Sequence, residues 1–243
     1  MNLAAHFDRL EPWLTILKPA GAGPFPVSVQ LHGCGGIQPM QFAYADAARD
    51  AGIAVVVLDS LGPRGLGRIE AQLTVCSGLR LRGAERAADF LAVLDWLQTQ
   101  RWADADRVAG AGWSHGAWSI MEALVAPPEG PRAPISRLRG AILVYPYAGP
   151  PARTRRLGWG ENRPKVYACL AGRDAVVGMR APDRALRRLA EDGLEVRRLT
   201  LSDATHCFDD ENASDPRTRY RPDLAAEARA FYVAALGECL GSA

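Results

Sequence analysis

The sequence predicts an α/β fold in which a mostly parallel sheet is covered by helices on both faces. Short apolar runs rich in β-branched residues alternate with longer segments that repeat apolar residues every three or four positions, from Val27 to the C-terminus. The chain has 243 residues, of which 48% are hydrophobic and 23% charged, enough for one domain with a large core. We therefore expect a single domain over residues 1–243, with residues 1–10 as a tail or short helix.

The strands and helices are expected where these two patterns occur. The apolar runs predict strands at Trp13–Leu17, Val27–Leu31, Ile53–Leu58, Arg107–Ala111, Ala141–Tyr145, Val166–Ala171 and Val196–Leu201. The helical periodicity predicts helices within Gln38–Gly52, Arg82–Gln100, His115–Ala126, Pro182–Gly193 and Pro222–Leu240. Two of these helices begin with Pro-Asp and two end at glycine, which are ordinary helix boundaries.

Two segments interrupt the alternation, Asp59–Leu81 and Pro146–Pro164. Both are rich in Gly, Pro and Arg, and both follow the end of an expected strand. Open α/β sheets bind their ligands at the carboxyl ends of the strands, so these segments are expected near a site. Neither is long enough to form a separate lid domain.

Charge and hydropathy exclude several classes of partner. The formal net charge is +2, and the only local basic cluster is Arg153, Arg155 and Arg156, so no long basic face is expected and nucleic acid is not a predicted partner. No segment approaches the ~18 apolar residues that a membrane span needs. The first residues lack an apolar run of signal-peptide length, which predicts a cytoplasmic protein.

The five cysteines predict neither a disulfide framework nor a zinc site. They are Cys34, Cys76, Cys169, Cys207 and Cys239, an odd number at irregular spacings without a Cys-x-x-Cys pair. We expect free thiols. A metal site of His32, Cys34, His206 and Cys207 is not favoured either, because no pair has ligand spacing. No cofactor or metal is therefore expected.

The stretch "VAGAGWSHGAWSIMEAL" (Val108–Leu124) carries the strongest motif. As a dinucleotide loop it fails, because His115 stands where the third glycine after Gly110 and Gly112 is required. It does contain G-x-S-x-G, from Gly112 through Ser114 to Gly116, directly after a strand and before a helix. Glycines flank the serine because the chain turns too sharply for larger side chains, which exposes the hydroxyl above the sheet. This context predicts that Ser114 is a nucleophile; the alternative is a glycine-rich turn with a capping serine.

A serine nucleophile needs a base and an acid, and both follow in the order Ser, Asp, His. Asp174 lies just past the strand that ends at Ala171, and His206 lies in the loop before the last helix. Asp203 is the main competitor for the acid; we favour Asp174 because an acid from a separate strand end can face the imidazole. Asp183 is interpreted as an N-terminal helix residue.

Two backbone N–H groups are expected to stabilise the oxyanion. The residue after the nucleophile normally supplies one, which predicts His115 in this role rather than as the base. The second is expected from the glycine-rich loop "HGCGG", with Cys34 the first candidate and Gly35 the next. Cys34 as a thiol nucleophile is the alternative, but it lacks the helix-turn setting that activates thiols.

These motifs together resemble the dienelactone hydrolase family of α/β-hydrolases. The resemblance rests on "LHGCGG", "VVVLDSLGPRGLG", "GAGWSHGA", "ILVYPYAG", "LAGRDAVV" and "ATHCFDD", in order from about Val27 to Asp210. It implies the α/β-hydrolase fold without a lid domain, and hydrolysis of small carboxylic esters or lactones with a triad at Ser114, Asp174 and His206. Typical members have a cysteine nucleophile and a glutamate in the early loop, so this chain resembles a serine-bearing branch.

Three further expectations follow from the resemblance. Prolyl-oligopeptidase-type catalytic domains share these motifs, which makes a peptidase the alternative activity, and a binding protein that keeps the fold is the alternative of another class. Cationic side chains bind the acidic lactones of the family, which suggests that Arg64, in the segment after the third strand, contacts a substrate carboxylate. The alternative is a structural role, in which Arg64 pairs with a nearby acid and holds its own loop in place.

Overall fold

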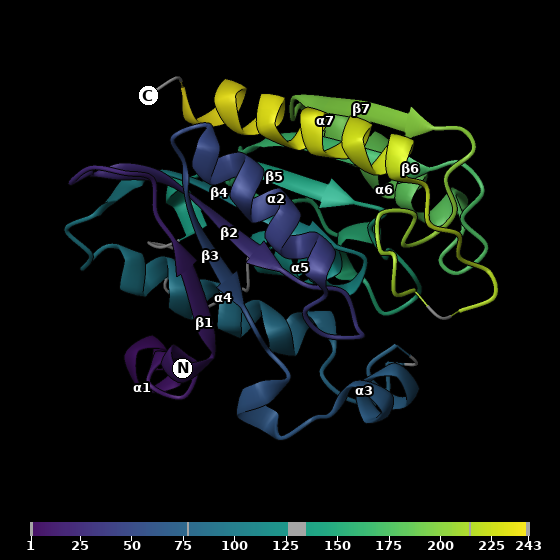
Figure 1. Cartoon of the computed structure of the whole chain (residues 1–243). Coiled ribbons are helices and arrows are strands. Elements are labelled where there is room, and N and C mark those ends of the chain that lie inside the picture. Colours follow the sequence, from purple (N-terminus) through teal and green to yellow (C-terminus); the bar gives the residue numbers. More distant parts are fainter. Residues whose placement is uncertain (1, 77, 126–134, 214, 242–243) are drawn as a thin grey trace.

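The computed structural model describes residues 2–76, 78–125, 135–213 and 215–241. Its centre is a seven-stranded sheet in the order β1-β3-β2-β4-β5-β6-β7 (Figure 1). The strands are β1 (Leu14–Leu17), β2 (Phe25–Leu31), β3 (Ala54–Leu58), β4 (Ala103–Trp113), β5 (Leu138–Val144), β6 (Lys165–Ala171) and β7 (Val196–Leu201). β1 pairs antiparallel with β3, and the other neighbouring pairs are parallel. The predicted fold class and its seven strands are confirmed.

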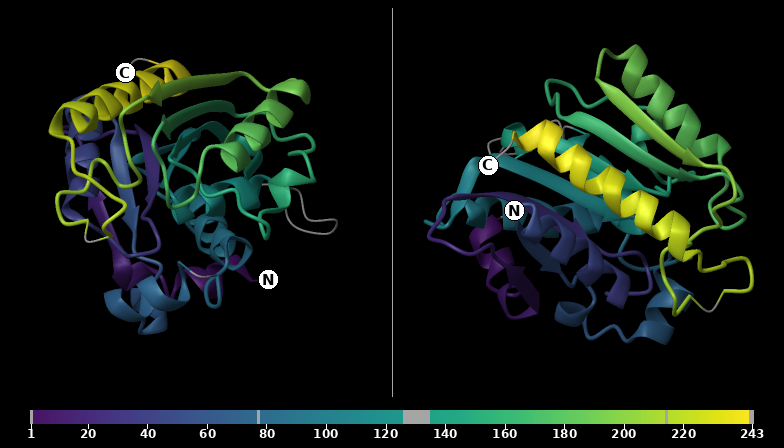
Figure 2. Two further views of the ribbon diagram at one scale, coloured as in Figure 1. Left: turned by 90° about the vertical axis from the view of Figure 1, so that its right-hand side faces the viewer. Right: turned by 45° about the horizontal axis from the view of Figure 1, so that its top comes forward.

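Helices cover both faces of this sheet (Figure 2). They are α1 (Leu3–Phe7), α2 (Pro39–Asp50), α3 (Arg68–Thr74), α4 (Gly83–Leu97), α5 (His115–Leu124), α6 (Arg180–Glu191) and α7 (Pro222–Leu240). Short 3₁₀ turns lie at Glu11–Trp13, Gly62–Arg64, Ile135–Arg137 and Arg153–Arg155. Side chains of α1, α4, α5 and α6 share one core with the sheet, and those of α2 and α7 share the core on the other face. None of the described helices is long and apolar enough to cross a membrane.

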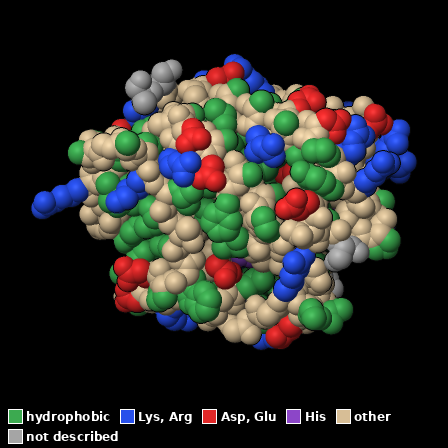
Figure 3. Space-filling model, in the orientation of Figure 1, with side chains coloured by type: hydrophobic (Ala, Val, Ile, Leu, Met, Phe, Trp, Pro, Cys, Tyr) green, Lys and Arg blue, Asp and Glu red, His purple; other side chains and the backbone are tan. Residues whose placement is uncertain are grey.

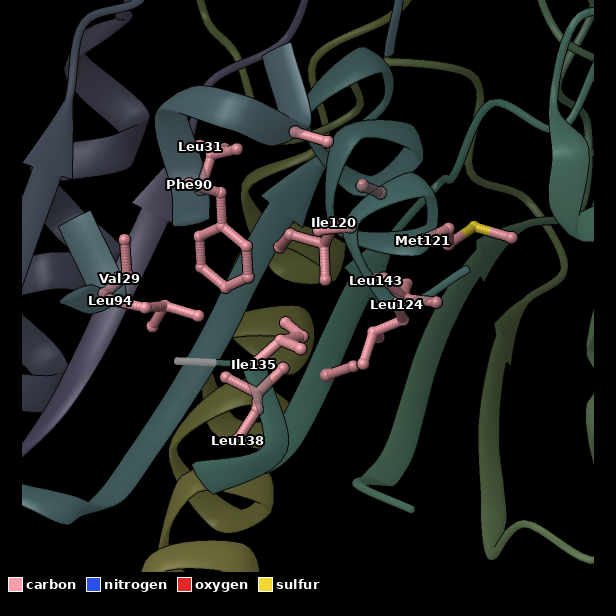
Figure 4. Packing of buried hydrophobic residues seen from close by; sticks show 14 of the residues in the cluster. Val29, Leu31, Phe90, Leu94, Ile120, Met121, Leu124, Ile135, Leu138 and Leu143 are labelled. Carbon is pink, nitrogen blue, oxygen red and sulfur yellow. The ribbon is translucent and has the colours of Figure 1, made fainter. Parts of the chain in front are cut away.

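The side chains of β2 show how a central strand fits between the two layers. Its odd positions, including Val29 and Leu31, pack under α4 and α5, where Figure 4 shows them beside Phe90. Its even positions, Ser28 and Gln30, are buried on the other face, and both hydrogen bond to the hydroxyl of Tyr232 in α7. Buried polar groups are tolerated when they are paired in this way.

Two elements differ most from the sequence expectation. β4 begins at Ala103 rather than Arg107, because Ala103 pairs with Phe25 ahead of a bulge in the ladder. α3 is a helix inside the segment Asp59–Leu81, where the sequence analysis assigned neither a strand nor a helix. It packs on a small cluster of its own, formed by Leu61, Leu66, Ala71, Val75 and Leu81.

The visible surface carries charges of both signs without a basic stripe. Figure 3 shows lysines and arginines intermixed with acidic side chains over the face seen in Figure 1. Many of the arginines are paired locally, as in Arg221 with Asp223 and Arg217 with Asp215. Exposed pairs of this kind contribute little to stability.

The start of α5 approaches the end of β2 so closely that only glycine fits between them. A Cβ placed on Gly116 would lie 2.1 Å from the carbonyl oxygen of Leu31 and 2.7 Å from that of His32. Both neighbours are backbone atoms, which cannot move aside without shifting the strand. This contact brings the loop after β2 against the turn that precedes α5.

We expect Gly116→Ala to destabilise the fold by about 1–3 kcal/mol, the usual cost of an extra methyl group in a tightly packed core. Thermal unfolding measures this as a lower Tm. Gly237→Ala in α7 is the matched control, because a Cβ there meets nothing within 4 Å and alanine favours the helix. A Gly116→Ala protein that melts at or above the wild-type temperature would contradict the contact.

Candidate active site

Ser114 lies in the sharp turn between β4 and α5. Its backbone has φ 52° and ψ −109°, and a positive φ is uncommon for a residue with a side chain. The turn needs glycine at position 112, because a Cβ there would lie 2.4 Å from the backbone nitrogen of Ala117. The N–H of Ser114 donates to the carbonyl of Val144 at 2.9 Å, which ties the turn to the end of β5. The surrounding structure therefore holds the serine in an unfavourable conformation.

His206 lies between Ser114 and Asp174. Its Nε2 is 2.9 Å from Ser114 Oγ and its Nδ1 is 2.6 Å from Asp174 Oδ2. The carboxylate only accepts, so Nδ1 carries the proton and Nε2 is free to accept the serine hydroxyl. The other carboxylate oxygen accepts the backbone N–H groups of Val176 and Val177, both at 2.9 Å. The structure thus brings the three residues predicted as the triad into one hydrogen-bonded chain.

The two competing acids lie elsewhere. Asp203 is half exposed and pairs with Arg173, with 2.7 Å between Oδ1 and Nη2. Asp183 pairs with Arg187 and Arg198 near the start of α6. Among the described residues, Asp174 is the acid that hydrogen bonds to His206.

A buried tyrosine–aspartate group packs behind His206, and sequence reasoning missed it. The Tyr145 ring centroid is 4.7 Å from that of His206, and its hydroxyl donates to Asp209 Oδ1 at 2.8 Å. The hydroxyl of Tyr44 donates to Oδ2 at 2.9 Å. Burial raises the pKa of Asp209 and, together with the nearby Asp209 charge, raises the pKa of both tyrosines. The closeness of Asp209 to His206 in "HCFDD" could have pointed to a role for Asp209 near the site. Its partners Tyr145, just after β5, and Tyr44, in α2, are distant in the sequence, so no spacing reveals them.

The two residues predicted to supply oxyanion donors lie beside Ser114. Cys34 and His115 line the same cavity as the serine. The loop that holds Cys34 is close, since a Cβ on Gly33 would lie 3.9 Å from the Cβ of Ser114. In the described part of the chain, neither the Cys34 N–H nor the His115 N–H has a backbone acceptor. Both groups are therefore available to a ligand.

The expectation of free thiols is wrong for two of the five cysteines. Cys34 and Cys76 form a disulfide that links the loop after β2 to the end of α3, with 5.2 Å between the Cα atoms. The pairing was missed because 42 residues separate the two cysteines and no spacing rule applies. It also removes Cys34 as a thiol nucleophile. Disulfides persist mainly in oxidising compartments, so this bond weighs against the predicted cytoplasmic location, which stays a prediction.

The prediction that Arg64 contacts substrate is not supported by its position. Its guanidinium forks onto the buried Asp89, with two N–O distances of 2.9 Å, and also donates to the carbonyl of Ser60. His6 reaches the same carboxylate at 2.7 Å. Burial raises the pKa of Asp89, but the bonds from His6 and Arg64 outweigh it and hold the pKa below its usual value. Arg64 therefore braces its loop against α4, which was the alternative interpretation.

The cavity beside Ser114 has a volume of about 440 Å³. Its apolar wall is formed by Met40, Val75, Trp113, Trp118, Tyr145, Tyr147, Val176 and Val177. Polar groups at the cavity include Arg68, Gln72, Asp210, Asp215 and Arg217. Arg68 and Gln72 belong to α3, so this short helix forms one side of the cavity.

A mostly parallel sheet with helices on both faces and a sharp strand-turn-helix connection after a central strand is the α/β-hydrolase fold, and this chain adopts it. Three solved structures show the same architecture. A candidate dienelactone hydrolase from Klebsiella pneumoniae has a TM-score of 0.72 at 16% identity, over 93% of this chain and 92% of its own. A dienelactone hydrolase-like promiscuous phosphotriesterase from metagenomic libraries has a TM-score of 0.70 at 18% identity, over 94% and 99%.

The third structure is the butyrate-bound esterase 2 of Thermogutta terrifontis, with a TM-score of 0.68 at 17% identity over 94% of this chain and 89% of its own. A profile of the prolyl oligopeptidase family matches residues 40–130, which span α2 to α5. A search of curated proteins finds no match. Proteins that resemble this chain in structure thus include dienelactone hydrolase-like proteins and esterases, as its motifs suggested.

The disulfide predicts the number of thiols that a titration detects. Denatured, unreduced protein should show three, from Cys169, Cys207 and Cys239, and reduction should raise this to all five cysteines. Cys76→Ser should show four before reduction, because Cys34 is released, whereas the control Cys239→Ser should show two. Five thiols in protein purified without reductant and exposed to air would contradict the pairing.

Proposed function

We propose that this chain is a serine hydrolase that cleaves carboxylic esters or lactones of small substrates through an acyl-enzyme intermediate. The observation that carries the proposal is the hydrogen-bonded chain from Asp174 through His206 to Ser114. Ser114 lines a cavity in which a substrate could bind. A serine hydroxyl in this setting is activated by its neighbouring imidazole. No metal or cofactor enters the proposal.

The proposed reaction has two steps, acylation of Ser114 and hydrolysis of the acyl-serine, and the same residues act in both. Ser114 Oγ bonds to the ester carbonyl carbon while its proton passes to His206 Nε2, and the carbonyl electron pair moves onto oxygen. The N–H groups of Cys34 and His115 stabilise that oxyanion. The alcohol leaves with the proton from His206, and water then attacks the acyl-serine by the same steps to release the acid. Asp174 orients the ring and stabilises the imidazolium.

The cavity supports small substrates. At about 440 Å³ it lies within the size range of small-molecule sites, and aromatic side chains supply much of its wall. The structures of similar fold include an esterase with bound butyrate, a short acyl group. We therefore propose that short acyl esters are better substrates than long ones, with α3 rather than a lid domain bounding the site.

A peptidase is the second candidate, because the profile that matches residues 40–130 belongs to the prolyl oligopeptidase family. Peptide amides and esters share the acylation chemistry, so the triad does not separate them. A panel with p-nitrophenyl acetate, butyrate and decanoate, small lactones and a prolyl p-nitroanilide distinguishes the two activities. Hydrolysis of the anilide in preference to all esters would favour the peptidase.

We expect wild-type protein to hydrolyse the short esters, and Ser114→Ala to lose the activity by about 10⁶-fold in kcat. Asp174→Asn should lower kcat by about 10⁴-fold, because the amide disturbs the tautomer of His206. The matched control Asp203→Asn breaks only an exposed ion pair and should stay within about threefold of wild type. If Asp203→Asn is instead the damaging change, the acid is misassigned. A folded wild-type protein without activity on any substrate of the panel would favour a binding protein.

A further inference from the structure

Arg86 is a fully buried cation that contacts the backbone of the loop after β2 and the side chain of the residue after Ser114. It lies on α4, and its Nη1 donates to the carbonyl of His32 at 2.6 Å. The same nitrogen is 3.4 Å from Nδ1 of His115, the first residue of α5, while Nε donates to Ser60 Oγ at 2.9 Å. Nη2 is buried without a hydrogen-bond partner. One guanidinium thus contacts both the loop after β2 and the residue after Ser114.

The next peptide of that loop is held by His32 itself. Its Nε2 accepts the backbone N–H of Ser60 at 3.1 Å, so the proton is on Nδ1, which donates to the carbonyl of Gly33 at 2.6 Å. The peptide between Gly33 and Cys34 is planar, so fixing its carbonyl also fixes the direction of the Cys34 N–H. Two consecutive carbonyls leading to Cys34 are therefore held by side chains, and each such bond polarises the N–H of its own peptide.

The positive charge of Arg86 has no acid in direct contact. Asp89, one turn further along α4, binds Arg64 and His6, and in the described part of the chain no carboxylate lies within ion-pair distance of Arg86. Burial lowers the pKa of Arg86 to about 10, against the attraction of Asp89, so the group stays charged at neutral pH. A buried charge without a paired acid is costly, and such costs are often found at functional sites.

The neighbouring imidazoles do not add charge there. Burial, and then the charge of Arg86, lowers the pKa of His115 well below its usual value, and the same two causes lower the pKa of His32. A guanidinium has only donors, so the Nδ1 of His115 that faces it is unprotonated. The positive charge beside the proposed oxyanion hole therefore comes from Arg86.

We propose that Arg86 is a positioning residue of the oxyanion hole: it holds the loop from His32 to Cys34 against the start of α5 and places a positive charge behind the donors. The inference rests on the proposed serine hydrolase function. Arg86 is buried and acts through the His32 carbonyl and the His115 imidazole rather than by touching substrate. Its contribution is largest when the carbonyl oxygen becomes an oxyanion, so it should appear in kcat rather than in KM.

Arg86→Lys and Arg86→Gln test this, with p-nitrophenyl acetate as substrate and a butyl trifluoromethyl ketone as inhibitor. The ketone carbon bonds to Ser114 Oγ, the serine proton moves to His206, and the ketone oxygen becomes an oxyanion. We expect kcat to fall by about 10- to 100-fold, less than the ~10²–10³-fold loss of a direct donor, with KM within about threefold. Affinity for the ketone should fall in parallel with kcat, and lysine, which keeps the charge, should retain more activity than glutamine.

Arg153→Gln is the control, because it too removes an arginine that hydrogen bonds to a buried group, in this case the acid Glu122, but away from the loop after β2. We expect Arg153→Gln to lower Tm without the selective fall in kcat, at nearly constant KM, that is expected of the Arg86 variants. Where Arg86→Gln does not fold, Ser60→Ala removes one bond from the guanidinium, together with the bond of Ser60 to Asp89, and leaves the charge of Arg86 in place. The expected loss in kcat is about 2- to 10-fold.

Two results would overturn the proposal. In the first, folded Arg86→Lys and Ser60→Ala proteins keep the wild-type kcat and the wild-type affinity for the ketone. In the second, KM of the Arg86 variants rises as much as their kcat falls, and Arg153→Gln shows the same changes. The failure of the proposed function looks different. In that case wild-type protein itself hydrolyses no ester, and the ketone does not bind it.

Discussion

The backbone conformation of Ser114 is the constraint on which the rest of the site depends. A side-chain-bearing residue with φ 52° and ψ −109° is held there only because the surrounding chain leaves no alternative. The bond to Val144 fixes one side, and the approach of α5 to β2, possible only at glycine, fixes the other. The same approach sets His115 beside the loop of Cys34. The same packing contact thus helps to place both Ser114 and the proposed oxyanion donors.

Two groups of buried polar side chains lie near this turn, and they differ in whether a buried charge is paired with an opposite one. On one side, Arg64 and His6 both contact Asp89, so that acid is well satisfied. The other group contains Arg86, which contacts only neutral groups, including the carbonyl of His32 and the imidazole of His115 beside the proposed oxyanion hole. Burial of such a charge lowers stability, which is consistent with a role in the site rather than in the fold.

The fold was predictable because its signal is local. Central strands such as β2 and β3 are short apolar runs with nearly complete burial, and a long helix such as α4 repeats apolar residues at three and four positions. The positions of Ser114, Asp174 and His206 were predictable for a related reason, since each follows a strand whose end lies at the same edge of the sheet.

What the sequence did not reveal depends on partners distant along the chain. Cys34 pairs with Cys76, which the chain places nearby by way of α3. Arg64 pairs with Asp89, which belongs to α4. Tyr145, which we expected to be the last residue of a strand, follows β5 with a positive φ of 34°, and its ring packs on His206. Residue types and spacing carry no record of these contacts, because each joins different elements.

The central claim is that Ser114 is the activated nucleophile of this chain, and covalent labelling with peptide mapping tests it most directly. A fluorophosphonate transfers its phosphonyl group to an activated serine with loss of fluoride, so intact mass should show one adduct per chain. Digestion and mass spectrometry should then locate that adduct on Ser114, and Ser114→Ala protein should stay unlabelled. An adduct on another residue, or equal labelling of Ser114→Ala, would contradict the account.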